Sequence, residues 1–191
     1  MRDPLIIGLA GRAGAGKDTV GMMLTKHDFG RLAFADPLRT MISALLGSLE
    51  IDLSYMIRRD RKESPIPQLG VSYRHLVQTL GTEWGRNAVA PDFWVRAAKA
   101  SLDDFAASYD RVVFTDVRFI NEVEAIQSWG GIIVWVDRDQ APPIREHISE
   151  QQLTANYPGI YARINNSGSR EETWEQVCRI VSRLELQELE S

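Results

Sequence analysis

A glycine-rich turn near the N-terminus has the residue types and spacing of a phosphate-binding loop. It follows the pattern Gly-x-x-x-x-Gly-Lys from Gly11 to Lys17, with a further glycine at Gly14. Backbone N–H groups can wrap a phosphate only where the chain adopts conformations that side chains would obstruct. Lys17 adds a charge for the β and γ phosphates, and the helix that follows directs its positive end toward them. The pattern predicts a nucleotide site at Gly11, Arg12, Ala13, Gly14, Ala15, Gly16, Lys17, Asp18 and Thr19.

One position departs from the usual motif. Asp18 stands where a Ser or Thr normally supplies a hydroxyl for Mg²⁺, and the hydroxyl comes one residue later at Thr19. The carboxylate could hold the metal directly, hold it through a water, repel the nucleotide, or only complement the helix N-terminus. We favour a metal contact through water for Asp18 and a phosphate contact for Thr19.

The elements that position this loop alternate along the chain. Apolar runs of strand character begin at Leu5, Arg31, Arg111, Ile132 and Ala162, and segments of helical spacing separate them. The strands are apolar on both faces, which is typical of a parallel sheet covered on two sides. We therefore expect an α/β fold: a three-layer P-loop NTPase with a doubly wound, mainly parallel sheet and helices on both faces.

The strand over 111–116 ends in a carboxylate. Ligands of open α/β sheets gather at the C-terminal ends of the strands, so Asp116 and Arg118 are expected at the same edge as the phosphate-binding loop. Asp116 would then orient the metal ion or its water. Another apolar strand ends at Asp137, directly before Arg138.

Two segments interrupt the alternation. Residues 47–70 are rich in charge and proline, and we interpret them as a mobile polar segment rather than another core element. Residues 138–158 are a lid candidate, in which His147 is either a proton carrier or, more simply, a hydrogen-bonded histidine. Asp36 precedes Pro37 at the start of a helix, so it is either an N-cap or an organiser of a second phosphate.

Length, composition and charge restrict the class of protein to which this chain can belong. With 191 residues, 44% hydrophobic and 25% charged, the chain fits one globular domain without an apolar run that could span a bilayer. The net charge of −4 comes from residues 171–191, so the rest of the chain is neutral and has no evident basic stripe for nucleic acid. Cys178 is the only cysteine, which agrees with a reducing compartment, and we expect it in the core.

Arginines outside the loop exceed what one nucleotide needs. A second anionic substrate would account for them, because a guanidinium binds phosphate through two parallel hydrogen bonds. Arg118 is the strongest candidate, since it follows the carboxylate strand directly. For Arg58, Arg59 and Arg61 a solvated surface position is equally compatible with the sequence.

Six stretches together resemble the deoxynucleoside monophosphate kinases found largely in bacteriophages. They lie at residues 11–19, 34–39, 74–86, 115–119, 147–150 and 164–168, so the resemblance extends over almost the full length of the chain. The block from Gln78 to Arg86, combined with Asp116-Val117-Arg118, is far more specific than the glycine-rich loop alone. The Gly-Lys-Asp-Thr sequence at 16–19 resembles that family's own version of the loop.

The resemblance implies an adenylate-kinase-like fold and transfer of the ATP γ-phosphoryl group to a deoxynucleoside 5′-monophosphate with Mg²⁺. The implied catalytic residues are Lys17, Asp18, Asp116 and Arg118, with Asp18 and Asp116 organising the metal through water. Residues Gly11 to Thr19 and Arg138 would hold ATP. The implied acceptor residues are Asp36, Arg39, Arg74, Trp84, Arg86 and Arg118, most of them in an acceptor-binding insertion at about 37–107. One P-loop kinase domain over 1–191 would carry all of these sites.

Other readings remain open at this stage. The acceptor could be another small molecule, as in dephospho-coenzyme A or phosphomevalonate kinases. A nucleic-acid-dependent ATPase would need a basic surface that the neutral body does not favour, and a nucleotide-binding protein without turnover would consume no ATP. We expect no nucleic-acid or membrane partner and a cytoplasmic location, which is the host cytoplasm for a phage-encoded chain. The sequence leaves a homodimer open.

Overall fold

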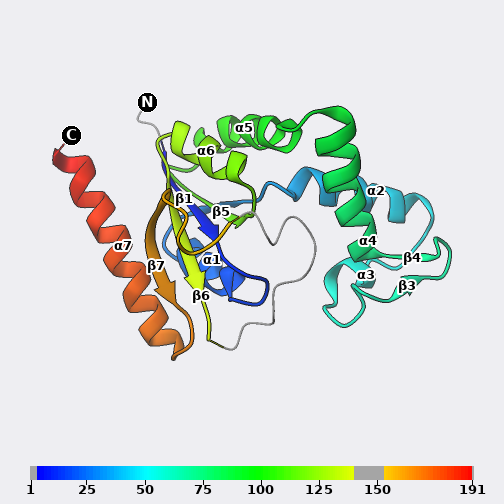
Figure 1. Ribbon diagram of the computed structural model, residues 1–191, viewed down its shortest axis with the longest axis horizontal. Coiled ribbons are helices and arrows are strands. Elements are labelled where there is room, and N and C mark those ends of the chain that lie inside the picture. Colours follow the sequence, from blue (N-terminus) through cyan, green and yellow to red (C-terminus); the bar gives the residue numbers. More distant parts are fainter. Residues whose placement is uncertain (1–3, 140–152, 191) are drawn as a thin grey trace. The chain divides into compact units, whose positions relative to one another are not determined.

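The computed structural model describes residues 4–139 and 153–190. Within that part the chain forms two compact units: Met1–Ala33 with Ser101–Ser191, and Phe34–Ala100. Each has its own cluster of buried apolar side chains. The chain leaves the first unit after Ala33 and returns at Ser101, so the second unit is an insertion into the first (Figure 1).

The first unit is built on a five-stranded sheet in which every pairing is parallel. The strands are β1 (Leu5–Ala10), β2 (Gly30–Leu32), β5 (Arg111–Val117), β6 (Ile132–Asp137) and β7 (Ile160–Asn165), in the order β2-β5-β1-β6-β7. Strand β1, which precedes the glycine-rich turn, is central. All strands are parallel, so the residues that follow β1, β5, β6 and β7 emerge at one edge.

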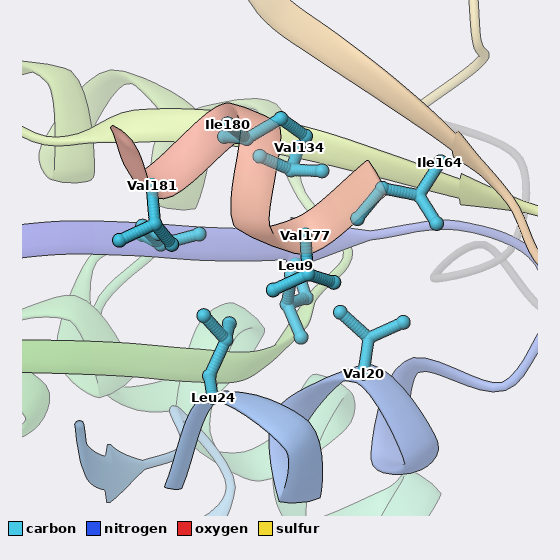
Figure 2. A pocket seen from close by; sticks show the side chains of 9 residues that line it. Leu9, Val20, Leu24, Val134, Ile164, Val177, Ile180 and Val181 are labelled. Atoms are coloured by element: carbon cyan, nitrogen blue, oxygen red, sulfur yellow. The ribbon is translucent and has the colours of Figure 1, made fainter. Parts of the chain in front are cut away.

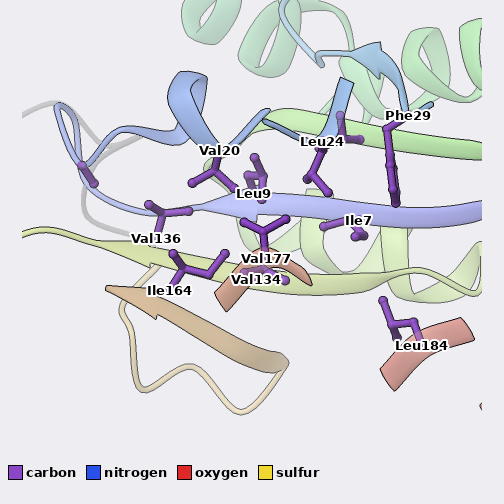
Figure 3. Close-up of a cluster of buried hydrophobic side chains, with 12 residues drawn as sticks. Ile7, Leu9, Val20, Leu24, Phe29, Val134, Val136, Ile164, Val177 and Leu184 are labelled. Atoms are coloured by element: carbon purple, nitrogen blue, oxygen red, sulfur yellow. The ribbon is translucent and has the colours of Figure 1, made fainter. Parts of the chain in front are cut away.

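Helices cover both faces of this sheet. Val20 and Leu24 of α1 (Lys17–Thr25) share a buried cluster with Val177 and Leu184 of α7 (Arg170–Glu190), and Figure 3 shows them pointing toward the same strands. On the opposite face, α6 (Ile120–Ser128) places Ile126 against the sheet where Gly8 leaves room for it. The predicted three-layer, doubly wound α/β fold is confirmed.

Between α1, α7 and the sheet lies a small apolar pocket of about 10 Å³ (Figure 2). Its lining comes from β1, α1, β6, β7 and α7, namely Ile7, Leu9, Val20, Leu24, Val134, Ile164, Val177, Ile180 and Val181. A space of this size without polar partners does not hold an ordered water. It is a packing gap of the core and offers no chemistry. Cys178, expected in this core, is only half-buried on α7.

The second unit is mainly helical. It contains α2 (Asp36–Ser48), α3 (Ser54–Ile57), the antiparallel pair β3 (Pro65–Ile66) and β4 (Val71–Ser72), α4 (Tyr73–Gln78) and η1 (Thr79–Val89). Helix α5 (Phe93–Ala106) begins in this unit and ends in the first. Its core comprises Leu38, Ile42, Leu46, Ile51, Tyr55, Ile66, Tyr73 and Trp94.

The prediction that residues 47–70 contribute nothing to a core is wrong. Ile51, Tyr55 and Ile66 are buried in the second unit. The charged residues around them satisfy one another: Arg61 donates to Asp52 at 2.9 Å and lies 4.0 Å over the Tyr55 ring. Hydrogen bonds from Ser54, then Arg61, lower the pKa of Asp52. The segment therefore packs through a few buried residues, which are too few to give a helical or strand periodicity in the sequence.

Several boundaries differ from the sequence expectations. Helical spacing predicts a helix over 17–27, but α1 ends at Thr25, and Asp28 then adopts a left-handed conformation with φ 64°. The apolar run at 31–34 predicts a strand, whereas β2 covers Gly30–Leu32, and β7 starts at Ile160, two residues before the expected Ala162. The sequence also predicts a helix over 90–108, whereas α5 covers only Phe93–Ala106.

Candidate active site

The glycine-rich turn connects β1 directly to α1 with a backbone that needs its glycines. Gly11, Gly14 and Gly16 have φ angles of 146°, 80° and 94°. A Cβ on Gly11 would collide with the Val136 carbonyl oxygen, and one on Gly16 would collide with the Asn166 side-chain nitrogen. Non-glycine residues rarely adopt these conformations, so the turn is specified by backbone sterics.

Helix α1 begins at the end of this turn. Gly16 is its N-cap, and its carbonyl accepts hydrogen bonds from the N–H groups of Thr19 and Val20 at 2.9 and 3.1 Å. Lys17, Asp18 and Thr19 therefore lie in the first turn, where the helix dipole is positive. The Lys17 ammonium donates to the carbonyls of Gly11 and Arg12 at 2.6 and 3.0 Å, so it bridges the two ends of the turn.

Strand β5 carries Asp116 at an irregularity in the sheet. Gly8 pairs with Phe114 and Ala10 with Val117, so β5 has one residue more than β1 between these pairs. Such a bulge redirects side chains. Thr115 packs against Gly21 of α1, whereas Val117 packs beside Gly8 on the opposite face, although residues two apart normally share a face. The bulge places Asp116, which is 9% exposed, at the end of the strand beside β1.

The turn after β5 is held by a buried carboxylate that the sequence reasoning did not single out. Glu122 of α6 is 3% exposed, and its Oε2 accepts hydrogen bonds from the Arg118 and Phe119 backbone N–H groups at 2.7 and 3.1 Å. This is the N3 carboxylate of a capping arrangement. Glu122 stands three residues after the N-cap, which is the spacing of a capping box, but the N-cap is Phe119 instead of the usual Ser or Thr. The sequence pattern was therefore not recognised.

Arg138 lies at the same edge of the sheet, directly after β6. Its backbone N–H is held by the Asp137 carboxylate at 3.0 Å, and its side chain is exposed. The next residue, Asp139, donates its N–H to Ser167 at 2.9 Å. In the first unit the glycine-rich turn, Asp116, Arg118 and Arg138 thus lie at or directly after the ends of β1, β5 and β6, at one edge of the sheet.

In the second unit, Asp36 and Arg39 are joined at the start of α2. Asp36 is the first residue of the helix and Ala35 is the N-cap, so the expected N-cap role of Asp36 is wrong. The Asp36 carboxylate instead accepts a hydrogen bond from Arg39 Nη1 at 2.9 Å, one turn later. Fixing the guanidinium in this way keeps its remaining donors in a defined orientation.

Tyr73 is a second partner of Arg39 that the sequence reasoning missed. Its side chain belongs to the buried cluster of the second unit, and its phenol is hydrogen-bonded to the Arg39 guanidinium. Burial raises the pKa of Tyr73, while the positive charge of Arg39 acts in the opposite direction. An aromatic residue at the start of a helix normally indicates packing, so the sequence offers no signal for this contact.

Arg74 and the residues of η1 complete the predicted acceptor set. Arg74 Nε lies 2.5 Å from Glu63 Oε1. Trp84 is 39% exposed and contacts Phe93 edge-on with a centroid distance of 5.3 Å, and Arg86 donates to the Pro91 carbonyl at 3.2 Å.

The spacing of Leu76, Val77 and Leu80 predicts a helix over 73–85. A helix is present there as α4 and η1, but η1 has the wider π pitch over Thr79–Val89. Such widened turns occur frequently at functional sites. Trp94 Nε1 donates to the Gly81 carbonyl at 2.7 Å, and its indole fills the space beside Gly85, so the wide helix is packed against a specific partner.

Some predicted features fall outside the described residues. His147 and the block 147–150 belong to this group, as does most of the expected lid at 138–158. Within residues 4–139 and 153–190, no three His, Cys, Asp or Glu side chains are grouped to hold a metal ion. In the same residues, no helix combines the length and apolarity needed to cross a membrane.

Comparison with known proteins decides the family. A family model described as deoxynucleotide monophosphate kinase matches residues 66–177, more than half of the chain. The chain belongs to the deoxynucleotide monophosphate kinase family. This confirms the resemblance seen in the sequence. The match begins after the glycine-rich turn, so the family assignment and the geometry of that turn are independent observations.

Individual members of the deoxynucleotide monophosphate kinase family are moderately similar to this chain. The protein of that name from Escherichia phage RB69 is 30% identical over 111 residues, which cover 58% of this chain and only 45% of the relative. A relative from Acanthamoeba polyphaga mimivirus, provisionally given the same name, is 27% identical over 188 residues, covering 93% of this chain and 96% of the relative.

A solved structure shows the same fold. The crystal structure of TT1252 from Thermus thermophilus superposes with a TM-score of 0.53 at 16% identity, covering 95% of this chain and 98% of that one.

Proposed function

We propose that this protein transfers the γ-phosphoryl group of ATP to a deoxynucleoside 5′-monophosphate. The observation that carries the proposal is a glycine-rich turn with three positive φ angles, closed by Lys17, in a member of the deoxynucleotide monophosphate kinase family. A turn of this kind presents backbone N–H groups and a helix N-terminus to phosphate oxygens. The family supplies the acceptor class.

The first unit would bind ATP. The backbone of residues 11–16 would enclose the phosphates with Thr19 adding its hydroxyl, and Lys17 would exchange its contacts with the Gly11 and Arg12 carbonyls for the γ-phosphate. Arg138, exposed at the same edge, would contact the nucleotide from the neighbouring strand. Phosphoryl transfer proceeds largely through positioning and charge stabilisation, which these groups provide.

The residues at this edge fit a magnesium ion. Mg²⁺ usually keeps several waters and takes one or two carboxylates together with substrate phosphates. Asp116 at the bulge of β5 and Asp18 in the first turn of α1 offer two carboxylates of that kind. When bound, the ion would neutralise charge that develops on the phosphate oxygens. Asp18 and Asp116 would orient its water ligands.

The second unit would bind the acceptor. Arg39, held by Asp36 and Tyr73, would contact the acceptor phosphate with its guanidinium, and Arg74 and Arg86 would add charge. Trp84 offers an exposed aromatic face to a base. Arg118 would assist the transfer itself, because Glu122 holds its backbone at the edge where the γ-phosphate is expected.

The decisive experiment measures ADP formation from ATP and Mg²⁺ with each deoxynucleoside 5′-monophosphate. Dephospho-coenzyme A and phosphomevalonate serve as alternative acceptors, and single- and double-stranded DNA test for a stimulated ATPase. We expect turnover only with deoxynucleoside monophosphates, abolished in Lys17→Ala. ADP formation that requires DNA, or none above the Lys17→Ala background with any acceptor, would contradict the proposal.

We also propose that the protein acts in the cytoplasm, where ATP and deoxynucleotides are available. A homodimer is compatible with the proposed reaction but not required by it.

A further inference from the structure

Asn166, directly after β7, contacts the backbone of the glycine-rich turn. Its side-chain Nδ2 donates a hydrogen bond to the Ala15 carbonyl at 2.9 Å, across 151 residues of sequence. This is a side-chain hydrogen bond to the turn from a distant strand. It falls on the peptide unit that precedes Gly16, the N-cap of α1.

Asn166 is itself fixed from two other directions. Its backbone N–H donates to the Asp137 carbonyl at the end of β6 at 2.8 Å. Its side-chain Oδ1 accepts from the Thr173 hydroxyl at 3.0 Å, and Thr173 is fully buried in the first turns of α7. The Thr173 hydroxyl also lies 3.1 Å from the Ser169 carbonyl, so one proton serves two acceptors. Three elements therefore determine where the Asn166 amide points.

The orientation of one peptide plane links this contact to phosphate binding. In a trans peptide the C=O and the following N–H point in opposite directions within one plane. Because the Ala15 carbonyl points at Asn166, the Gly16 N–H points away from it. A Cβ on Gly16 would collide with Asn166 Nδ2, so the side-chain amide lies directly against this residue and only glycine leaves room for it.

We propose that Asn166 is a positioning residue for phosphate binding, which orients the Gly16 N–H toward the bound polyphosphate through its hydrogen bond to Ala15. The inference rests on the proposed function, because it takes the glycine-rich turn as the phosphate site. It assigns to Asn166 and Thr173 a role in nucleotide affinity without direct contact to the nucleotide. Loss of the amide would let the Ala15–Gly16 plane rotate, and one N–H would be lost to the phosphates.

Binding of inorganic tripolyphosphate measures this effect without the base or the acceptor. Calorimetry should show that Asn166→Ala raises the dissociation constant about tenfold or more, the loss of a hydrogen bond to a charged group. Thr173→Val should weaken binding in the same direction, and Thr173→Ser, which keeps the hydroxyl, should restore it. In ¹⁵N-labelled protein the Gly16 amide resonance should shift with tripolyphosphate in the wild type and much less in Asn166→Ala.

Asn165→Ala is the matched control. Asn165 is the neighbouring residue at the end of β7, and its side chain accepts a hydrogen bond from the Ser167 N–H at 2.9 Å. That hydrogen bond does not involve residues 11–16. The Asn165→Ala variant should bind tripolyphosphate with a dissociation constant within about twofold of the wild-type value. In steady-state kinetics Asn166→Ala should raise KM for ATP and leave KM for the acceptor unchanged.

The outcomes separate the two hypotheses. If the wild type binds tripolyphosphate and Asn166→Ala binds equally well, the role of Asn166 is refuted and the proposed function stands. Equal losses in Asn165→Ala and Asn166→Ala would also refute it, since general loosening of the turn would then suffice. If the wild type binds no tripolyphosphate, both the proposed function and this inference fail.

Discussion

The Glu122 carboxylate accepts the backbone N–H of Arg118 at 2.7 Å and thereby fixes the turn that follows the carboxylate strand. The same oxygen accepts the Phe119 N–H, so one buried group satisfies two donors at the start of α6. A buried acceptor with two backbone donors is costly to remove, because both N–H groups would be left unpaired.

Glu122→Ala should lower the free energy of unfolding by about 2–4 kcal/mol and reduce kcat through misplacement of Arg118. Glu122→Gln keeps an acceptor oxygen and should lose less on both counts. Urea unfolding and steady-state kinetics measure the two effects. Unchanged unfolding midpoints in both variants would show that the turn does not depend on Glu122.

Gly11→Ala should abolish ATP binding and destabilise the first unit by about 1–3 kcal/mol, because its φ of 146° and the Val136 carbonyl both oppose a Cβ. Gly47→Ala is the matched control, since a Cβ at Gly47 in α2 meets nothing within 4 Å. In a helix that change should stabilise by up to about 1 kcal/mol. Similar thermal shifts in both variants would contradict the steric argument.

Arg39→Lys should raise KM for the acceptor about tenfold or more and leave KM for ATP unchanged. A lysine keeps the charge but cannot contact Asp36 and a phosphate in the fixed geometry of a guanidinium fork. Arg96→Lys is a suitable control, because Arg96 forms an exposed ion pair with Asp92 and has no assigned role. An unchanged acceptor KM in Arg39→Lys would exclude Arg39 from the acceptor site.

The stability of the second unit should fall at alkaline pH because of Tyr73. Burial raises the pKa of the Tyr73 phenol in the folded state, so its neutral form favours folding. The stabilisation is complete below the ordinary tyrosine pKa of about 10 and is lost as pH rises through the folded value. Unfolding free energies measured across this range should fall less steeply in Tyr73→Phe. Parallel curves for the two proteins would show that Tyr73 titrates normally.

Two buried tryptophans provide a comparison of hydrogen bonding. Trp94 Nε1 donates to the Gly81 carbonyl, whereas the buried Trp135 Nε1 has no acceptor among the described residues. Trp94→Phe removes the hydrogen bond to the Gly81 carbonyl and should cost about 1 kcal/mol beyond the loss of volume. Trp135→Phe removes an unpaired donor and should cost less. Chemical denaturation of both variants checks the order.

Features that depend on adjacent residues could be predicted from the sequence. The turn from Gly11 to Lys17 is specified within a few residues, and buried strands such as β1 and β5 can be recognised in the sequence as apolar runs. The bulge beside Asp116 could not be predicted, because it arises from the pairing of β5 with β1, two strands about a hundred residues apart. The order in 47–70 was missed for a similar reason, since Ile51, Tyr55 and Ile66 become core residues only when α2 covers them.

The acceptor residues that we propose follow from the family resemblance, whereas the contacts that these residues make in the second unit could not be predicted from the sequence. Nothing in the spacing of Arg39 and Tyr73 indicates that they meet. The same holds for Asn166 and Ala15, which meet only when β1, β6 and β7 assemble in the sheet.

The π pitch of η1 has a consequence for how the protein could diversify. Deleting one residue within Thr79–Val89 would return that stretch toward the α pitch and change which side chains of η1 face its present partners. Trp84 and Arg86 would then exchange their present neighbours for others in a single genetic step. Relatives that differ in length here are thus natural places to look for altered base preference.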